Sequence, residues 1–235
     1  KDTLWMHADS LKIYTHNIGT DSVYRKVHAF AHVRAYRQDL QAVCDSLVFN
    51  SQDSCMTMYR DPIAWNYNRQ LLGEVMKVYM NDSTVRKAEI IGQALSVEKV
   101  DDKNHYNQVS STRMNAYFND GAMRRADAIG SVKTVFYNTD NKDSVLTELN
   151  YLETDTMRMY MSPTRQLEKI WASKSVGTMY PITQIPPDKY RLPEFAWFDY
   201  VRPTDKDDVF NWRGKKAGSE LKAVRRREAP VRRFE

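Results

Sequence analysis

The chain alternates apolar and polar residues in five short stretches that share one order of residue types. Each stretch has a small or acidic cluster, then a large aliphatic residue, then an alternating apolar run. They are ADSLKIY from Ala8, CDSLVF from Cys44, GEVMKVYM from Gly73, STRMNAYF from Ser111 and TDTMRMYM from Thr154. Alternation with a period of two is typical of a β-strand that has one buried and one solvated face. The pattern predicts five copies of one strand-based unit.

The large aliphatic residue anchors each copy, and successive anchors are separated by 36, 29, 38 and 43 residues. Polar residues such as Lys12, Lys77 and Arg158 lie between the apolar ones and are expected on the opposite face. The apolar residues expected to share one face are Leu11, Ile13, Leu47, Phe49, Met76, Val78, Met80, Met114, Phe118, Met157, Met159 and Met161.

A second strand follows in each unit. The stretches AEIIGQALSV and ADAIGSVKTV place Gly92 and Gly130 each 16 residues after the preceding anchor. A glycine at a fixed place inside a strand usually marks a bend, a bulge or a close backbone approach. The equivalent stretch in the first unit is VHAFAHVRAY, in which one face is expected to carry Val27, Ala29, Ala31, Val33 and Ala35.

Turn signals separate the two strands of a unit, as at Asn81-Asp82-Ser83, Asn119-Asp120-Gly121 and Ser162-Pro163. Asn50 to Asp53 predicts a further hairpin turn between Cys44 and Cys55, although the register does not decide whether these cysteines form a disulfide. No stretch before the C-terminal tail keeps helical apolar spacing over three turns. The sequence therefore predicts an all-β, antiparallel fold.

The residue composition changes at Pro181. Five of the eight prolines lie between residues 181 and 203, mixed with aromatic residues. Because proline cannot donate to a strand ladder, this segment is expected to pack its aromatics on the sheet without joining it. We therefore divide the chain into a repeat domain, residues 1–180, and an extended segment with a basic tail, residues 181–235.

The net charge of +5 is concentrated in the tail. Residues 213–235 hold nine Lys or Arg and three acids, a balance of +6, so residues 1–212 carry −1. The terminal arginines Arg225, Arg226, Arg227, Arg232 and Arg233 fit a solvated tail, a contact to anionic lipid or phosphate, or a nucleic-acid arm. We see no interleaving of aromatic and basic residues on the repeats, whose polar faces are mixed in sign, so nucleic acid is not an expected partner.

Motifs for catalysis, cofactors and metals are missing from the sequence. It holds no G-x-S-x-G, H-E-x-x-H, P-loop or dinucleotide fingerprint, and Cys44 has no evident histidine partner. His28 and His32 are expected on one strand face but too far apart to share a metal. No apolar run approaches the roughly 18 residues needed to span a bilayer. We expect a protein that is not an enzyme and uses no cofactor or metal.

The repeats resemble the OstA-like (LptA) family of periplasmic lipopolysaccharide-transport proteins. The resemblance covers roughly residues 5 to 180. It is carried by the strand Val33 to Tyr36, the turn Gln38-Asp39, the strand Val43 to Phe49 and a strand from Met56 to Trp65. The many methionines and the run YRKVHAFAHVRAY look most like the long OstA-like proteins of Bacteroidetes-type bacteria. The sequence departs from the family pattern at Asp61-Pro62, where the family has a glycine, and near Ser175 and Gly177.

The resemblance implies a β-jelly roll, an open pair of antiparallel sheets with an apolar trough that holds lipid acyl chains. The twelve alternating apolar residues above would then line the trough. It implies a periplasmic carrier of lipopolysaccharide or a related glycolipid, whose secretion signal is absent from this sequence. End-to-end strand pairing with other OstA-like domains, or a homo-oligomer, would follow from free strand edges.

The residues themselves leave two interpretations of the apolar stripe. The Leu, Met and Val stripe is either the lipid-binding wall of an open trough or the packed core of a closed sandwich. In the second case the protein is a lipid-free structural scaffold that docks partner domains through its strand edges.

Overall fold

The computed structural model describes residues 3–81, 84–101, 103–140, 145–164, 167–216 and 219. The first seven strands are β1 (Trp5–His7), β2 (Ser10–His16), β3 (Tyr24–Arg37), β4 (Leu40–Asn50), β5 (Cys55–Tyr59), β6 (Ile63–Asn66) and β7 (Arg69–Leu72). The others are β8 (Val75–Asn81), β9 (Thr84–Lys99), β10 (Tyr106–Asn119), β11 (Ala122–Thr139), β12 (Leu146–Met161), β13 (Leu167–Ala172) and β14 (Val176–Pro181). All pairings are antiparallel, which confirms the predicted fold class.

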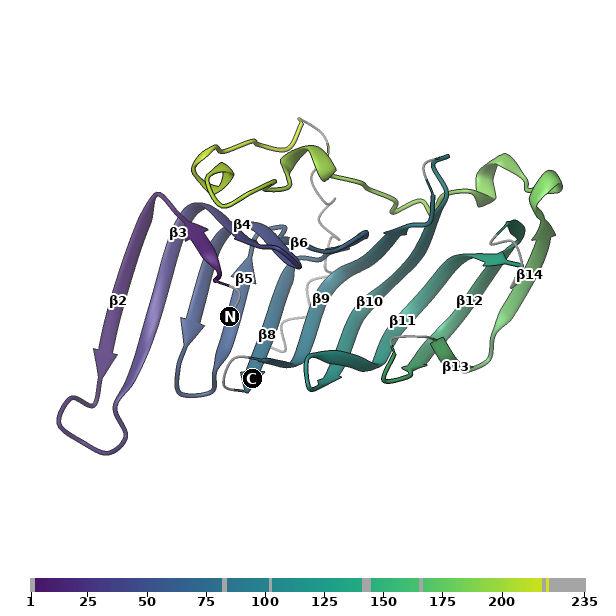
Figure 1. Ribbon diagram of the computed structural model, residues 1–235. Coiled ribbons are helices and arrows are strands. Elements are labelled where there is room, and N and C mark those ends of the chain that lie inside the picture. The colour runs from purple at the N-terminus through teal and green to yellow at the C-terminus, as the bar shows by residue number, and fades with distance from the viewer. Residues whose placement is uncertain are drawn as a thin grey trace, which may run out of the picture.

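Six long strands are shared by two layers of sheet, namely β3, β4, β9, β10, β11 and β12. One half of β3 pairs with β2 and the other half with β1, and β12 pairs with β13 and β14 in the same way. In the same way, one half of β4 pairs with β5 and the other half with β6, and one half of β9 pairs with β8 and the other half with β7. We call the layer that contains β2, β5, β8 and β13 the lower sheet, and the layer that contains β1, β6, β7 and β14 the upper sheet (Figure 1).

The strands bend where they pass from one sheet to the other. The register shifts between Phe30 and Val33 in β3 and between Ile129 and Val132 in β11. Gly130 has a φ of +83°, a left-handed conformation that glycine adopts without steric cost. A Cβ at Gly130 would lie 2.7 Å from Thr112 Oγ1 on the neighbouring strand. The prediction that the repeated glycines mark bends is confirmed.

The inner faces of the two sheets pack against each other near these bends. Leu47, Met58 and Met76 of the lower sheet form one buried cluster with Val33 and Ala94 of the upper sheet. A second cluster joins Ala128 and Met157 to Val109 and Val132. The core therefore runs along the line of bends, from β3 to β12.

A strap, residues 182–216, runs back across the outer face of the upper sheet from β14 toward β3 (Figure 1). Its regular elements are the short 3-10 helices η1 (Ile182–Gln184), η2 (Pro187–Lys189), η3 (Asp199–Val201) and η4 (Asp208–Phe210). Phe195, Trp197 and Phe198 pack on a cluster around Trp65 of β6. The expectation that this segment packs its aromatics on the sheet is confirmed.

Buried glutamines of the upper sheet hold the strap by its backbone. Gln108 donates to the Tyr190 carbonyl and accepts from the Leu192 amide, at 2.9 and 2.8 Å. Gln70 repeats this pattern six residues further on, with Ala196 and Phe198 at 2.9 and 2.8 Å. Each glutamine side-chain amide thus makes the pair of hydrogen bonds that the backbone of a neighbouring strand would make. It satisfies strap N–H and C=O groups that burial would otherwise leave without hydrogen bonds.

Two sequence expectations are corrected by the bends. The strand expected from Met56 to Trp65 is two strands, because Arg60 and Asp61 both have positive φ values. Ala31, expected on the apolar face of β3, lies in its bend with a φ of 57°. His28 lies before the bulge in β3 and His32 lies within it, with a φ of 53°.

Two further questions from the sequence concern a disulfide between the cysteines and the position of the terminal arginines. Cys44 and Cys55 are both buried and free, so no disulfide joins them. The terminal arginines from Arg225 to Arg233 lie outside the described residues. Within the described part of the chain, no helix is long and apolar enough to pass through a bilayer.

Candidate functional site

The five anchors lie in a single row on the inner face of the lower sheet. Pairing runs directly from Leu11 to Ala29, Leu47, Met58 and Met76, and then onward through Ile90, Met114, Ala128 and Met157 to Ala172. Directly paired residues of adjacent strands point to the same face. The sequence alignment of the five stretches therefore corresponds to physical neighbours in the sheet.

A second apolar row runs parallel to the first, two residues further from the bends. It consists of Ile13, Val27, Phe49, Met56, Val78, Ala88, Ala116, Ala126, Met159 and Ile170. Beyond it lie Met80 paired with Val85, Phe118 with Met123, and Met161 with Leu167. All twelve residues expected on one face thus belong to the inner side of the lower sheet.

Burial along these rows falls with distance from the bends. In the anchor row Leu47, Met76 and Met157 are buried, and Met157 is 1% exposed. The residues in the outer rows, such as Met80, Phe118 and Met161, are half-buried, except on the edge strands, where Ile13, Leu167 and Ile170 are exposed. The interior is therefore a sealed core next to the bends and a partly solvated apolar wall further out.

The facing wall, on the upper sheet, is built from smaller side chains. Its inner row runs through Ala35, Ala42, Ala64, Leu71, Ser96, Val109, Thr134 and Leu152. The next row outward is polar, with Arg69 bonded to Glu98 at 3.0 Å. The interior thus has one apolar margin, on the lower sheet, and one charged margin, on the upper sheet.

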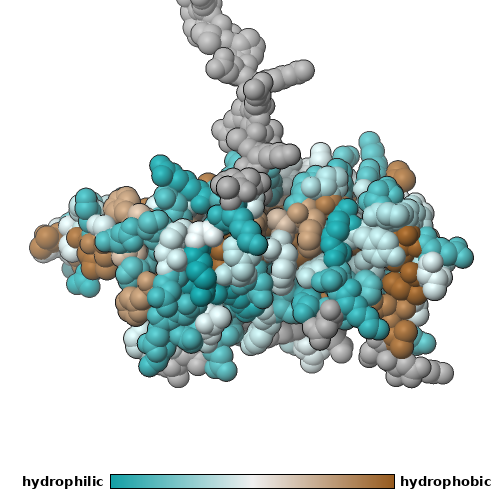
Figure 2. Space-filling view, turned by 90° about the horizontal axis from the view of Figure 1, so that it is seen from above, coloured by the Kyte–Doolittle hydropathy of each residue, from teal (hydrophilic) through white to brown (hydrophobic). Residues whose placement is uncertain are grey.

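The two ends of the interior expose apolar residues on strand edges. Leu11 and Ile13 on β2 are 54% and 61% exposed, so the structure places them at the end of the wall and not within it. Ile170 on β13 and Val176 on β14 are 44% and 74% exposed at the opposite end. Figure 2 shows hydrophobic surface at both ends of the molecule.

The outer face of the lower sheet carries an arrangement that the sequence analysis missed. Aromatic and basic residues alternate from strand to strand in a row that we call the cation–aromatic ladder: Tyr79, Lys87, Tyr117, Arg125, Tyr160 and Lys169. Lys87 Nζ lies 5.7 and 5.6 Å from the ring centres of Tyr79 and Tyr117. The expectation that the repeats lack interleaved aromatic and basic residues is wrong, because the two kinds of residue alternate from strand to strand in this row.

Cys44 lies buried in β4, and charged residues gather beside it at the bend. Burial raises the pKa of the Cys44 thiol to about 12, with a further rise from Asp45, so the thiol stays protonated at neutral pH. No three His, Cys, Asp or Glu side chains of the described segments are placed to hold a metal ion. A pocket of about 270 Å³ lies at the bend beside the end of the strap, where Arg60 pairs with Asp45 at 3.2 Å and Lys215 with Asp61 at 3.8 Å.

Comparisons with known proteins add one finding. No protein-family model matches the chain, and no curated protein matches it. Among solved structures, the chain is similar to LptH, the LptA-homologous periplasmic component of the conserved lipopolysaccharide transport device from Pseudomonas aeruginosa. The TM-score is 0.44 and the sequence identity 11%, over 64% of this chain and 96% of that chain.

Proposed function

We propose that the protein is a non-catalytic carrier that holds the acyl chains of lipopolysaccharide, or of a related glycolipid, between its two sheets. The observation that carries this proposal is the pair of continuous apolar rows on the inner face of the lower sheet. Half-buried Met80, Phe118 and Met161 lie beyond these rows, at the margin furthest from the bends. Burial of acyl chains there would be worth about 0.8 kcal/mol per CH₂ group.

The chemistry of the two margins fits an amphipathic ligand. Methionine side chains are flexible and polarisable, so they adapt to acyl chains of different shape. The polar margin around Arg69 and Glu98 would face the headgroup, where charged oxygens can accept hydrogen bonds from a guanidinium. The resemblance of the repeats to the OstA-like family suggests the same class of ligand. It also suggests a periplasmic location and a place in a transport bridge with other OstA-like domains.

The test is photo-crosslinking of the purified protein with lipid A that carries a photoreactive acyl chain. We expect labelled residues, identified by mass spectrometry, in the two outer rows and not at Met157, which is 1% exposed. Met161→Glu should lower the crosslinking yield at least tenfold, because a carboxylate would be buried beside the acyl chain. Ile18→Glu, in a loop and 78% exposed, is the matched control. Labelling confined to the tail would overturn the proposal.

A closed scaffold is the second candidate function, and the sealed anchor row favours it. Met159→Glu separates the two candidates, since Met159 packs against the buried cluster around Met157. In a carrier, the substitution abolishes lipid capture while the fold survives. In a closed scaffold it unfolds the protein, which thermal melting would reveal.

A further inference from the structure

The outer face of the lower sheet has the chemistry of a surface that binds anions. In the cation–aromatic ladder, Arg125 Cζ lies 4.2 Å from the ring centre of Tyr117 and Lys169 Nζ lies 5.9 Å from that of Tyr160. The ladder crosses six strands side by side, which at about 4.8 Å per strand spans roughly 24 Å (Figure 1). No acid stands in this row.

The acids of this face lie in the adjacent row and are neutralised by cations. Glu89 is 6% exposed and bonds Lys87 at 2.6 Å and Arg113 at 3.0 Å. Asp127 is 5% exposed and bonds Arg125 at 2.8 Å, with Arg158 at 3.9 Å. Each buried acid thus has two basic partners, which leaves the solvated layer of this face positive.

Exposed aromatic residues accompany the cations at both ends of the face. Trp171, 44% exposed, packs under Arg158 at 5.3 Å, and Tyr14 on β2 is 46% exposed. Lys12 lies 5.7 Å from the ring centre of Phe30. Tyrosine and tryptophan with nearby lysine and arginine are the side chains that settle at the headgroup level of a bilayer.

We propose that the outer face of the lower sheet docks on a bilayer surface that carries anionic phospholipids. A membrane is favoured over single-stranded nucleic acid because the cations lie over the tyrosine rings, which leaves those faces covered where a base would stack. Positive charge spread over several strands complements a surface of many headgroups. This proposal does not depend on lipid binding between the sheets.

The experiment is flotation of the full chain with vesicles of pure phosphatidylcholine and with vesicles that also contain phosphatidylglycerol. The expected result is binding to the anionic vesicles alone, lost at high salt as charge screening requires. Lys169→Glu should weaken that binding about tenfold, because it reverses one cation near the surface. Lys169 is exposed on an edge strand, so the variant is expected to fold.

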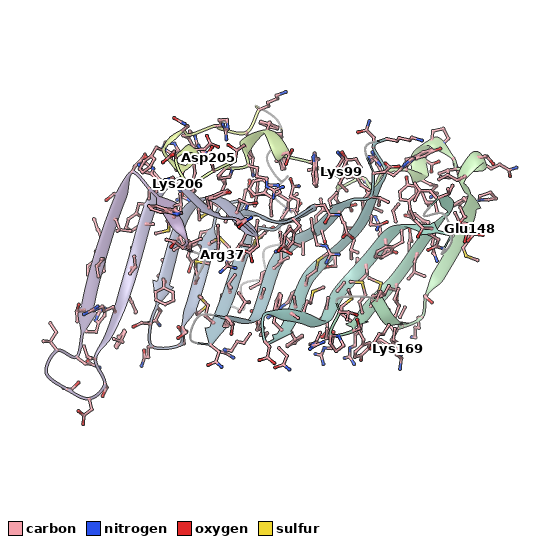
Figure 3. The ribbon with its side chains drawn as sticks, viewed as in Figure 1. Arg37, Lys99, Glu148, Lys169, Asp205 and Lys206 are labelled. Atoms are coloured by element: carbon pink, nitrogen blue, oxygen red, sulfur yellow. The ribbon has the colours of Figure 1, made fainter. Side chains whose placement is uncertain are left out.

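Lys206→Glu is the matched control, because Lys206 is an exposed lysine on the strap that lies 5.8 Å from the ring of Trp5. Figure 3 labels both lysines, Lys169 at the lower end of β13 and Lys206 on the strap above the upper sheet. The control should bind as the unaltered chain does. Equal binding by all three proteins, equal loss in both variants, or affinity for a single-stranded oligonucleotide with none for vesicles would each overturn the proposal.

Discussion

Asp208 holds the end of the strap to the upper sheet through one carboxylate oxygen. Its Oδ2 accepts from the Thr204 amide at 2.9 Å and from Arg34 at 3.4 Å, and it also pairs with Arg213. Burial by itself would raise the pKa of Asp208, but the Thr204 amide and the two guanidinium groups outweigh burial and lower it. The carboxylate is therefore charged in the folded protein over a wider pH range than in the unfolded chain.

Stability should consequently fall in acid. Because the folded-state pKa of Asp208 is lowered, its contribution is complete above the ordinary value of about 3.9 and is lost as the pH falls through the lower value. Asp208→Asn should cost about 3 kcal/mol at pH 7, since it leaves buried Arg34 without its carboxylate. In urea denaturation the difference in free energy of unfolding between this variant and the unaltered chain should become smaller below about pH 4.

The control for this prediction is Asp188→Asn, on the same strap. The Asp188 side chain is 74% exposed and lies 3.6 Å from its neighbour Lys189. Its substitution should leave the free energy of unfolding unchanged at every pH. If the loss of unfolding free energy caused by Asp208→Asn stayed constant down to pH 2, the argument that the pKa of Asp208 is lowered would be contradicted.

The bent strand is the element that converts one continuous ladder into two facing sheets. Two consecutive residues with positive φ recur at the bends, as at Gly92 and Gln93 in β9 and at Gly130 and Ser131 in β11. The bulge turns the strand without changing which side chains point inward, because Ala128 and Val132 both lie in the inner cluster. The element therefore sets both the separation of the sheets and the continuity of the apolar rows.

Substitution at such a bend should destabilise the fold in two separable ways. Gly130→Ala imposes a left-handed φ on alanine and places its Cβ 2.7 Å from Thr112 Oγ1. Gly19→Ala imposes the same φ strain, since Gly19 has a φ of +82°, but its Cβ would meet nothing within 4 Å. We expect a loss of about 1 kcal/mol for Gly19→Ala and about 3 kcal/mol for Gly130→Ala, measured by urea denaturation. Equal losses would show that the contact with Thr112 is unimportant.

The whole molecule is a stack with free strand edges at both ends. β1 and β2 each pair with β3 alone, and β13 and β14 each pair with β12 alone, among the described strands. Edges of this kind are templates for pairing with another chain, and those on β2 and β13 also expose apolar side chains. End-to-end association of copies, or of related domains, is the assembly that this shape favours.

Light scattering over a range of protein concentrations measures that association. We expect the mass to grow with concentration in the absence of lipid. Ile170→Lys, on the edge of β13, should keep the protein monomeric, because edge lysines oppose strand pairing. Ile18→Lys, in the loop after β2, should associate as the unaltered chain does. Growth that persisted in Ile170→Lys would place the contact elsewhere.

Most of the residues that face the candidate interior could be predicted from the sequence. The period-two alternation fixes the face of each strand, and the repeated order of residues brings Leu47, Met76, Met114 and Met157 into one row. The position of Leu11 and Ile13 at an exposed edge could not be predicted, because exposure depends on which strand ends the sheet. Their role in lipid binding, like that of the whole row, stays a prediction.

What the sequence determined by itself is the class of fold, the apolar face of each unit and the glycines at two bends, because these depend on neighbours along the chain. The tertiary structure alone decided the cation–aromatic ladder, the strap held by Gln70 and Gln108, and the charged margin at Arg69. In each of these, the interacting groups lie on different strands or on the strap, up to 128 residues apart in the chain. Local patterns carry no information on such contacts, since folding brings them together only when the sheet register and the path of the strap are set.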